Sequence, residues 1–529
     1  MSLKSELESN VGQGRVAVVV GAGPSGCLAA MLLLRQGWTV HVIEMRDKDA
    51  SIGSVSKQRS WPIGMFPRGI NAVLKAVPDA TDFFESRTYH SMVFHKNDGT
   101  VTFKIDRWQF GASLVHRTEA AALLTKAMLK YEDLISIHYS TCFTGADFYE
   151  KVARFQVQGS DEPLVLNYDV LIGADGAMSG VRSALIDCFP TSIHLKLLLR
   201  TDNRVYRAFY GMPKDPQALT WEPAGRQGPA TDGHWPAAGN PAEPGICFLP
   251  MPGKKPGINV AVSYDVESGT YGGFVPMVEA AAGQLPETVE GWTTWVEENL
   301  HPPVPQSWVK PLAAQLDTSP VNRFPWVQRA STMYIPGTST VLIGDAAHTV
   351  TPALGQGLNS ALEDAVLVAD SLASEPGNVE AALHCFNKAR FPQIKALQEL
   401  ELGFRASAEP LFSFARLFAS IWPSKAIDTN IFGATDVGVW PRLRVKAYTH
   451  TKYAISSVLY AVLGKKRTEA MLPLFFHGPS MIEVQVGAID YINMIRILDA
   501  MGVLASSGAT LGAVGLFVLG RSLVAAARK

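Results

Sequence analysis

Cysteine is scarce in this 529-residue sequence, and its five cysteines form no C-x-x-C pair. They are Cys27, Cys142, Cys188, Cys247 and Cys385. Scattered cysteines are typical of reduced, buried residues in an intracellular protein, so neither a disulfide framework nor a metal site is expected. The sequence also lacks an excess of positive or negative charge. The formal net charge of -1 argues against nucleic-acid binding, which requires a basic face.

The N-terminus lacks the features of a targeting segment. The sequence MSLKSELESNVGQG has no apolar core, and it holds two glutamates and a single lysine. Neither a secretory signal peptide nor a transit peptide is therefore predicted. We expect the chain to begin in the cytosol.

Charged residues are absent from a stretch near the C-terminal end. Residues 501–520 carry no charge over a length that can cross a bilayer, and Arg521, Arg528 and Lys529 follow. Gly508 and Gly512 have the small-xxx-small spacing of membrane helix contacts. The segment is a candidate transmembrane tail anchor. Because it is rich in Gly, Ala and Ser, its insertion free energy is marginal, and a buried amphipathic helix is the alternative.

The stretch Val16 to Asp47 contains a glycine-rich turn between two apolar runs. Gly21, Gly23 and Gly26 have the spacing G-x-G-x-x-G after the first run, and Glu44 closes the second. This context is typical of a dinucleotide-binding βαβ unit, whose helix N-terminus receives the phosphates. The Glu44 carboxylate would accept hydrogen bonds from ribose hydroxyls. Because it would also repel a 2′-phosphate, FAD or NAD is expected rather than NADP. An ordinary strand-to-helix turn is the alternative.

Two further clusters join glycine to aspartate after apolar strands. The sequence NYDVLIGADGAMSGVRSAL places Asp175 in such a turn, and TSTVLIGDAAHTVTPALGQGLNSALED places Gly344 and Asp345 in another. Gly355 and Gly357 then precede a helix from about Leu358. Asp345 at the end of a parallel strand is well placed to meet a ribityl or ribose hydroxyl, and the glycines let backbone approach a flat ring or an anion.

The length of the chain predicts two or three domains. We expect a loop from residue 50 to a short helix at GINAVLKAV, a β-hairpin over 89–105, and a helix over LVHRTEAAALLTKAML with Arg117 at its start. Residues 195–321 show short, β-like periodicity apart from a helix at LPETVEGWTTWVEENL. The Gly-, Pro- and Ala-rich stretch 222–245 is expected to be a surface insertion.

In this order, the three clusters resemble the single-component FAD-dependent aromatic hydroxylases, the class A flavoprotein monooxygenases. The likeness runs from about Val16 to about Arg390. Within that family, RSWPIGMFPRGINAVLKAVP, the GSD before the second cluster, VRS after it, and GDAAH followed by GQG and Asn359 are similar to the kynurenine 3-monooxygenase branch.

The resemblance implies an α/β fold with a Rossmann-like, para-hydroxybenzoate-hydroxylase-like FAD-binding domain, an inserted mixed β-sheet and a helical C-terminal region. The FAD-binding domain would be discontinuous, over 14–85, 113–186 and 322–390. The substrate-binding sheet would comprise 86–112 and 187–321, and the helical region 391–500, before the tail 501–520.

The resemblance also implies residue roles. The expected cofactor-binding residues are Gly21, Gly23, Ser25, Gly26, Glu44, Arg117, Asp175, Gly344, Asp345, Gly357, Leu358 and Asn359. Pro352, Gly355, Gly357 and Asn359 would face the flavin ring, and no side chain is assigned as a certain catalyst. Arg117 would pair with the pyrophosphate, a surface arginine being the alternative. Asp175 and Arg182 would support their turn, and His348 would either approach the phosphates or be structural.

The implied reaction uses NADPH or NADH and O₂ to hydroxylate an aromatic substrate through a flavin C4a-hydroperoxide. The family clamps its amino-acid substrate with an arginine and a tyrosine on the hairpin. Here Arg87 is a loose counterpart, and Phe103 lies where the tyrosine is wanted. A hydroxylase or epoxidase of a lipophilic substrate, a flavin-dependent reductase, and a non-catalytic flavin-binding protein remain alternatives.

The location follows from the tail and the resemblance together. We expect a membrane-associated protein with a cytosolic catalytic domain, at the mitochondrial outer membrane, with the endoplasmic reticulum or the cytoplasm as alternatives. The small-molecule substrate and O₂ are the other expected partners.

Overall fold

The computed structural model describes residues 14–49, 62–87, 89–95, 101–106, 113–201, 204–213, 246–252, 258–265, 268–279, 285–301, 304–350, 352 and 355–402. The chain divides into two compact units, Met1–Phe391 with Asn430–Gly433, and Pro392–Thr429 with Ala434–Lys529. The expected insertion at 222–245, most of the helical region 391–500 and the tail 501–520 lie outside the described residues. No helix in the described ranges is long and apolar enough to cross a membrane.

A five-stranded parallel sheet forms the first layer, with the strand order β19-β11-β1-β2-β7. Its strands are β1 (Val16–Val20), β2 (Thr39–Ile43), β7 (Ile135–His138), β11 (Val170–Gly173) and β19 (Thr340–Leu342). β11 and β19 are buried at every residue, as expected for parallel strands covered on both faces. Because β1, β11 and β19 are neighbours, the three glycine clusters that follow them meet at one edge of the sheet.

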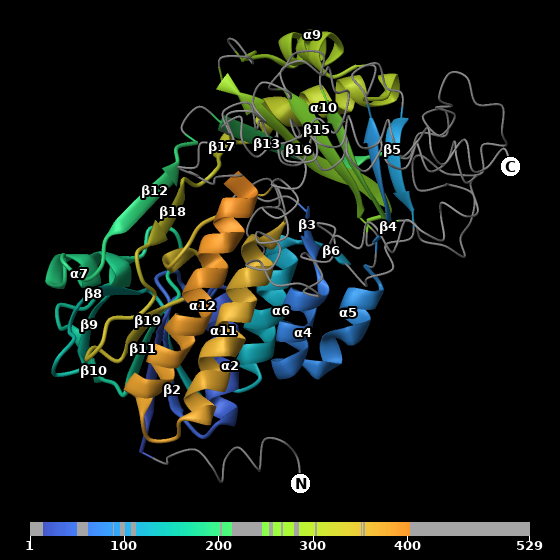
Figure 1. Ribbon diagram of the computed structural model, residues 1–529. Coiled ribbons are helices and arrows are strands. Elements are labelled where there is room, and N and C mark those ends of the chain that lie inside the picture. Colours follow the sequence, from blue (N-terminus) through green and yellow to red (C-terminus); the bar gives the residue numbers. More distant parts are fainter. Residues whose placement is uncertain are drawn as a thin grey trace, which may run out of the picture. The chain divides into compact units, whose positions relative to one another are not determined.

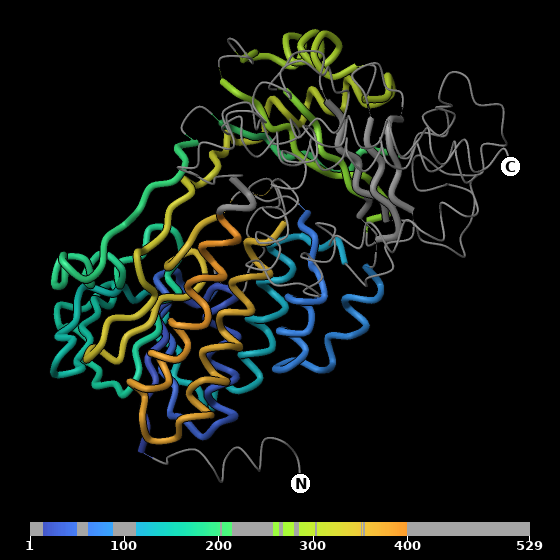
Figure 2. The backbone as a smooth tube through the Cα atoms, in the orientation of Figure 1, coloured from blue at the N-terminus to red at the C-terminus, as the bar shows by residue number. Residues whose placement is uncertain are grey.

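Helices from both ends of the first unit pack together beside this sheet (Figure 1). They are α2 (Pro24–Arg35), α4 (Pro67–Ala76), α6 (Arg117–Leu129), α11 (Gln356–Ser374) and α12 (Val379–Leu402). α2 packs between α6 and α11, and α4 packs on α11. Figure 2 shows the early, blue segments beside the late, yellow and orange ones. The FAD-binding layer is therefore built from segments far apart in the sequence.

A small antiparallel sheet, β10-β9-β8, and one helix follow α6 in the chain. The strands are β8 (Thr141–Asp147), β9 (Val152–Val157) and β10 (Leu164–Asn167), and α7 (Gly180–Cys188) packs against β8. Two short two-stranded sheets complete this part. They pair β3 (Pro62–Met65) with β6 (Ser113–His116), and β12 (Leu195–Leu199) with β18 (Val327–Ala330).

A seven-stranded mixed sheet has the order β17-β13-β16-β15-β14-β4-β5. Its strands are β4 (Tyr89–His95), β5 (Val101–Asp106), β13 (Arg204–Met212), β14 (Ile246–Pro252), β15 (Asn259–Asp265), β16 (Thr270–Val278) and β17 (Asn322–Arg323). β4 and β5 form the expected hairpin, and β4 joins β14 in parallel. The α/β fold with an inserted mixed sheet is therefore confirmed.

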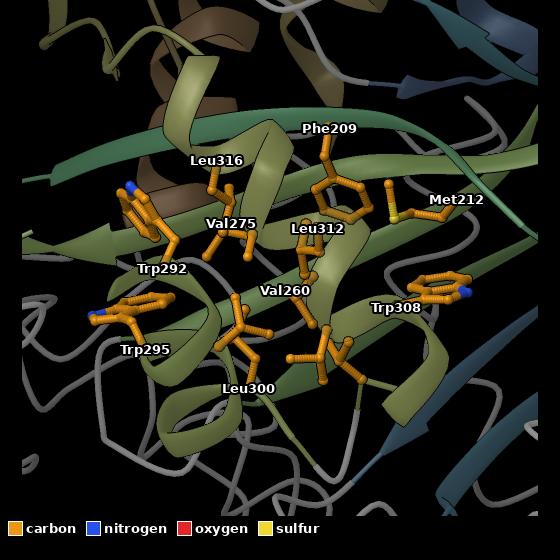
Figure 3. Packing of buried hydrophobic residues seen from close by; sticks show 14 of the residues in the cluster. Phe209, Met212, Val260, Val275, Trp292, Trp295, Leu300, Trp308, Leu312 and Leu316 are labelled. Atoms are coloured by element: carbon orange, nitrogen blue, oxygen red, sulfur yellow. The ribbon is translucent and has the colours of Figure 1, made fainter. Parts of the chain in front are cut away.

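Two helices, α9 (Val289–Asn299) and α10 (Gln306–Thr318), bury one face of this sheet. Trp292 and Trp308 lie among Phe209, Val260 and Leu312, all at most 1% exposed (Figure 3). Burying side chains of this size contributes about 1.5–3 kcal/mol each relative to leaving them exposed. The core therefore fixes the mixed sheet as a rigid support.

Three elements differ from the sequence expectation. Pro62–Met65 is strand β3 rather than a loop, because its partner β6 lies about fifty residues later and gives no local signal. Leu114–His116, the first residues of the expected helical stretch, belong to β6, while the helix begins at Arg117 as expected. Residues 306–318 are helix α10 rather than β-like, and Pro311 inside it obscured the helical pattern. The remaining short elements are α5 (Thr81–Glu85), η2 (Pro78–Ala80) and η4 (Gly344–Ala346).

Candidate functional site

The first glycine turn separates a tight side from an open side. A Cβ atom on Gly21 would lie 2.5 Å from the Ala174 carbonyl oxygen, and one on Gly26 would lie 1.9 Å from the Gly21 carbonyl oxygen. Gly21 also has a φ of +104°. A Cβ on Gly23 would meet nothing within 4 Å. Two glycines thus allow close packing of the chain, while the third leaves open space at the start of α2.

The N-terminus of α2 carries no capping side chain within the described part of the chain. Gly23 is the N-cap residue, Pro24 is the first helical residue, and the first turn holds no acid. Ser25, in this turn, is 8% exposed. An uncapped, neutral helix start next to open space suits an anionic phosphate, because backbone N–H groups and the helix dipole both favour negative charge there.

Glu44 lies at the end of β2 with a carboxylate that already has protein partners. One oxygen accepts the Ala22 N–H at 2.9 Å, and the other accepts the N–H and the Nε of Arg46 at 3.0 and 2.8 Å. The residue is 4% exposed. These bonds fix its orientation beside the glycine turn, where its remaining lone pairs are the ones that could accept ribose hydroxyls.

The second cluster forms a turn that is fastened to its neighbours. Asp175 accepts the Val181 N–H at 3.1 Å through one oxygen, and its other oxygen has no hydrogen-bond partner among the described residues. Arg182 is 4% exposed and donates to the Ala346 carbonyl at 2.8 Å and the Ala177 carbonyl at 2.7 Å. Arg182 therefore links the second cluster to the third and holds the backbone of both turns.

The third cluster meets the start of α2. Gly344 has a φ of +57°, and a Cβ built on it would lie 3.1 Å from Ser25 Oγ. Asp345 follows in η4 with a solvent-exposed side chain. The surrounding protein nevertheless desolvates this carboxylate and raises its pKa above the ordinary value, against the favourable charges of His348 and Arg117. The Asp345 side chain is thus open to solvent, and so to a ligand, while the surrounding protein still desolvates its carboxylate.

Arg117 is the first residue of α6 and is exposed. Its positive charge favours lower pKa values of Asp345, in the third cluster, and of Tyr206, on β13 of the mixed sheet. Burial raises the pKa of Tyr206 to about 12, so this phenol keeps its proton at neutral pH. The arginine expected to pair with a pyrophosphate therefore acts electrostatically on the aspartate expected to hold the ribityl chain.

The expected flavin-facing loop is held by Asn359. Its Oδ1 accepts the Phe66 N–H at 2.9 Å, and its Nδ2 donates to the Gly64 and Gly355 carbonyls at 2.9 and 2.7 Å. Asn359 is fully buried, and these bonds occupy its amide. The side chain therefore ties β3 to the loop, and its contact with the flavin ring stays a prediction.

The other loop residues lie nearby. Gly355 has a φ of +64° and donates to the Pro352 carbonyl at 3.1 Å. Gly357 and Leu358 lie in the first turn of α11, which begins at Gln356, and are partly exposed. The backbone of this loop remains the predicted contact for a flat ring.

Sequence reasoning missed a buried set of charges behind the site. Asp364 is fully buried and accepts hydrogen bonds from the Gly344 N–H, His348 and Arg390. His348 is 2% exposed and is held by this carboxylate, which matches the structural alternative. The available signal was the pair Glu363–Asp364 within an otherwise apolar stretch of α11.

The substrate candidates fare differently from the cofactor residues. Arg87 donates to the Phe83 carbonyl at 3.2 Å, lies 3.7 Å from Glu119, and stacks over the Phe83 ring at 4.1 Å. Its side chain is 12% exposed. These contacts make Arg87 a brace between α5 and α6 and do not support it as a substrate clamp. Phe103 lies in β5 opposite Phe94, and its side chain is outside the described part.

Residues of this chain fit bound FAD. The open space at Gly23, the uncapped α2 start, exposed Arg117 and Asp345 lie along the edge where the three clusters meet. The unpartnered oxygen of Asp175 is a further acceptor there. No group of three or more metal-ligating side chains occurs among the described residues.

Comparison with known proteins relates the chain to FAD-binding enzymes. A family described as "FAD binding domain" matches residues 15–193 and 263–397, which is more than half of the chain. A kynurenine 3-monooxygenase of Xanthomonas campestris is 26% identical over 505 residues, covering 92% of this chain and 96% of that protein. One from Phaeosphaeria nodorum is 26% identical over 401 residues, covering 73% of this chain and 76% of that protein.

Solved structures share the fold. The tetrameric form of 2-methyl-3-hydroxypyridine-5-carboxylic acid oxygenase superposes with a TM-score of 0.55 at 18% identity, covering 81% of this chain and 99% of that one. Pseudomonas aeruginosa PqsL in complex with 2-aminobenzoylacetate gives 0.54 at 19% identity, covering 77% and 99%. The chain therefore belongs to the FAD binding domain family, as an FAD-dependent monooxygenase of the aromatic hydroxylase type.

Proposed function

We propose that this protein uses NADPH or NADH and O₂ to hydroxylate an aromatic substrate of the kind that kynurenine 3-monooxygenases take. The observation that carries the proposal is the meeting of three glycine clusters at the ends of β1, β11 and β19, with Asp345 and Arg117 beside them. The similarity to a kynurenine 3-monooxygenase over 92% of the chain supports the substrate class.

The chain's own residues have distinct tasks in this proposal. The α2 N-terminus at Gly23 and the guanidinium of Arg117 bind the pyrophosphate, and Asp345 accepts a hydroxyl of the ribityl chain. Bound FAD supplies the redox chemistry, taking electrons from the nicotinamide and activating O₂. Asn359 sets the backbone of the loop at Gly355 against the ring, so that the ring faces one direction.

A second candidate substrate is a lipophilic aromatic without an amino-acid head group. Arg87 favours it, because its guanidinium is engaged by Glu119, the Phe83 carbonyl and the Phe83 ring. An amino-acid substrate would have to displace these contacts or find another cation. The flavin chemistry is the same for both substrates, and only the substrate end of the site differs.

The proposed function is tested by following flavin bleaching by NADPH, with and without L-kynurenine, while O₂ uptake is recorded. We expect a yellow protein whose flavin is reduced faster when kynurenine is present, with 3-hydroxykynurenine as the product. Reduction at a rate unaffected by kynurenine would keep the monooxygenase and move the search to lipophilic aromatics. A purified protein that binds no flavin would contradict the proposal.

We also propose that residues 501–520 tether the protein to a membrane, with the catalytic domain in the cytosol. The support is their uncharged length and the basic residues that follow. The outer mitochondrial membrane is the proposed site, in keeping with the kynurenine 3-monooxygenase resemblance.

A further inference from the structure

Four charged side chains and His348 form a continuous network behind the third glycine cluster. Arg68 donates to both carboxylate oxygens of Glu363 at 2.6 and 2.7 Å, and Arg390 reaches the same carboxylate at 2.6 Å. Arg390 Nε also donates to Asp364 at 2.6 Å, and Asp364 lies 2.7 Å from His348 Nε2. The network joins α4, α11, α12 and the loop after η4.

The network is buried most completely where it approaches the cofactor site. The exposed fraction of the side chains falls from 23% at Glu363 to 2% at Arg390, 1% at His348 and 0% at Asp364. Removing charges from water costs several kcal/mol per ion and is offset only by good geometry and full hydrogen bonding. Such a network is a poor means of gaining stability, and its geometry fixes the backbone of the third cluster instead.

At the Asp364 end, the network binds the protein backbone. Its Oδ2 accepts the Gly344 N–H at 2.8 Å, and Gly344 is the left-handed residue that opens the η4 turn. Burial opposes ionisation of this carboxylate, but the charges of His348 and Arg390 together with these hydrogen bonds hold its pKa below the ordinary value. Asp364 is therefore a fixed anion that holds the N–H of Gly344.

The turn is held on its other side as well. The Gly344 carbonyl accepts the N–H groups of Ala347 and His348, and the Ala346 carbonyl accepts Arg182 at 2.8 Å. Asp345 is therefore the one residue of η4 whose neighbours on both sides are bonded while its own side chain is exposed. Its direction depends on the anchors around it.

We propose that Asp364 and Arg390 are positioning residues for the flavin site, which hold the Gly344–Ala346 turn so that Asp345 meets the cofactor. The inference rests on the proposed function, since it takes Asp345 as a ligand of FAD. Arg390 acts through Asp364, because its Nε orients the carboxylate that receives the Gly344 N–H. Neither residue touches the cofactor in this proposal.

The test compares Asp364→Asn with Glu380→Gln as a matched control. Glu380 also anchors backbone, accepting the N–H groups of Gly337 and Ser339, at the opposite end of β19 from Gly344. Both substitutions keep the size of the side chain and remove its charge. We measure the thermal midpoint, the dissociation constant of FAD by titration of the stripped protein, and the absorption spectrum and midpoint potential of the bound flavin.

We expect Asp364→Asn to bind FAD at least about tenfold more weakly, with a shifted spectrum and potential, because the amide holds the turn less firmly. Glu380→Gln should lose stability yet bind FAD as the unaltered protein does. Equal losses of stability in both variants, with FAD affinity, spectrum and potential unchanged in Asp364→Asn, would overturn the proposal.

Arg390→Lys keeps the inference testable if Asp364→Asn does not fold. Lysine retains the charge but cannot reach Asp364 and Glu363 together as the guanidinium does. We expect a smaller shift in the same direction, and an unchanged flavin spectrum and affinity in a folded Arg390→Lys protein would count against the proposal. Failure of the unaltered protein to bind FAD would instead contradict the proposed function.

Discussion

The glycines of the first cluster have different roles, which can be distinguished by replacing each of two of them with alanine. Gly26→Ala places a Cβ 1.9 Å from the Gly21 carbonyl oxygen, so we expect overpacking to lower the free energy of unfolding by about 1–3 kcal/mol. Gly23→Ala meets nothing within 4 Å, so folding should survive while the methyl group fills the space that a phosphate needs. Thermal unfolding and FAD titration of the stripped proteins measure the two effects.

The two glycine variants control for each other. If Gly26→Ala melts at the temperature of the unaltered protein, the close packing of α2 on the turn is not what excludes a side chain there. If Gly23→Ala binds FAD with unchanged affinity, the phosphates do not lie at this helix start.

Arg87 is predicted to stabilise the protein without binding substrate. Arg87→Met keeps an apolar stem over the Phe83 ring but loses the Glu119 and Phe83 carbonyl contacts, so we expect a loss of about 1 kcal/mol in unfolding free energy. The KM for substrate should stay within about twofold, because no uniform binding contact is removed. Steady-state kinetics and thermal melts provide the comparison.

Arg35→Met is the matched control for Arg87, since Arg35 donates to the Lys75 and Ala76 carbonyls on α4. Both variants should lose stability and keep KM. A KM raised tenfold or more in Arg87→Met alone would restore Arg87 as the clamp for a substrate carboxylate.

Cys27 is predicted to resist thiol reagents although it lies in the cofactor turn. Burial raises its pKa to about 12, and its Sγ lies 3.3 Å from the Ala22 carbonyl oxygen, so it stays a protonated thiol at pH 8. Iodoacetamide should label exposed Cys142 in the native protein and reach Cys27 only after denaturant is added. Peptide mass spectrometry reads both sites, and equal labelling rates would refute the prediction.

At the scale of elements, β2 and β7 carry a histidine pair that makes stability depend on pH. His41 Nδ1 lies 3.1 Å from His138 Nε2, and burial lowers the pKa of both rings. The unfolded chain therefore takes up protons first, at about pH 6.5, while the folded rings stay neutral to lower pH. The stabilisation is complete above that pH and is lost as the pH falls through the lowered folded values.

Thermal midpoints measured from pH 8 to pH 5 test this pair. We expect the midpoint to fall below about pH 6.5, and His138→Gln to flatten that part of the curve because one titrating ring is gone. His194→Gln should leave the curve unchanged, since His194 is exposed. A curve of the same shape in His138→Gln would place the pH dependence elsewhere.

Elements with a strong local pattern were predictable and those defined by distant partners were not. The apolar run at β1 and the alternation of β4 and β5 are visible in a few residues, and both are confirmed. β3 exists because it pairs with β6, a pairing that no window of sequence contains. The hydrogen bonds of Asn359 with Gly64 and Phe66 join residues about 295 positions apart, so they too could be found only from the folded structure.

At the scale of the whole molecule, the sequence predicted the FAD-binding fold because three motifs each follow a strand of the parallel sheet. It missed Asp364 and Arg390, since a buried charge looks like a surface charge until its partners are known. The sequence assigned Arg87 from its position before the hairpin and could not show its contacts with Glu119 and Phe83, so its role as a substrate clamp stays a prediction. Sequence motifs thus predict where glycine turns follow strands better than they predict which side chains contact one another.

The last prediction concerns the proposed tether at 501–520. A segment this rich in Gly, Ala and Ser is only marginally favourable in a bilayer, so two central charges should be decisive, at about 2.5–3.5 kcal/mol each. We expect the unaltered protein to stay with membranes after alkaline carbonate washing and to be released by detergent. The double substitution Leu511→Arg and Leu516→Arg should move it to the supernatant with its flavin retained, because the match to the FAD binding domain family ends at residue 397. Release of the unaltered protein by carbonate alone would mean that the segment does not span a membrane.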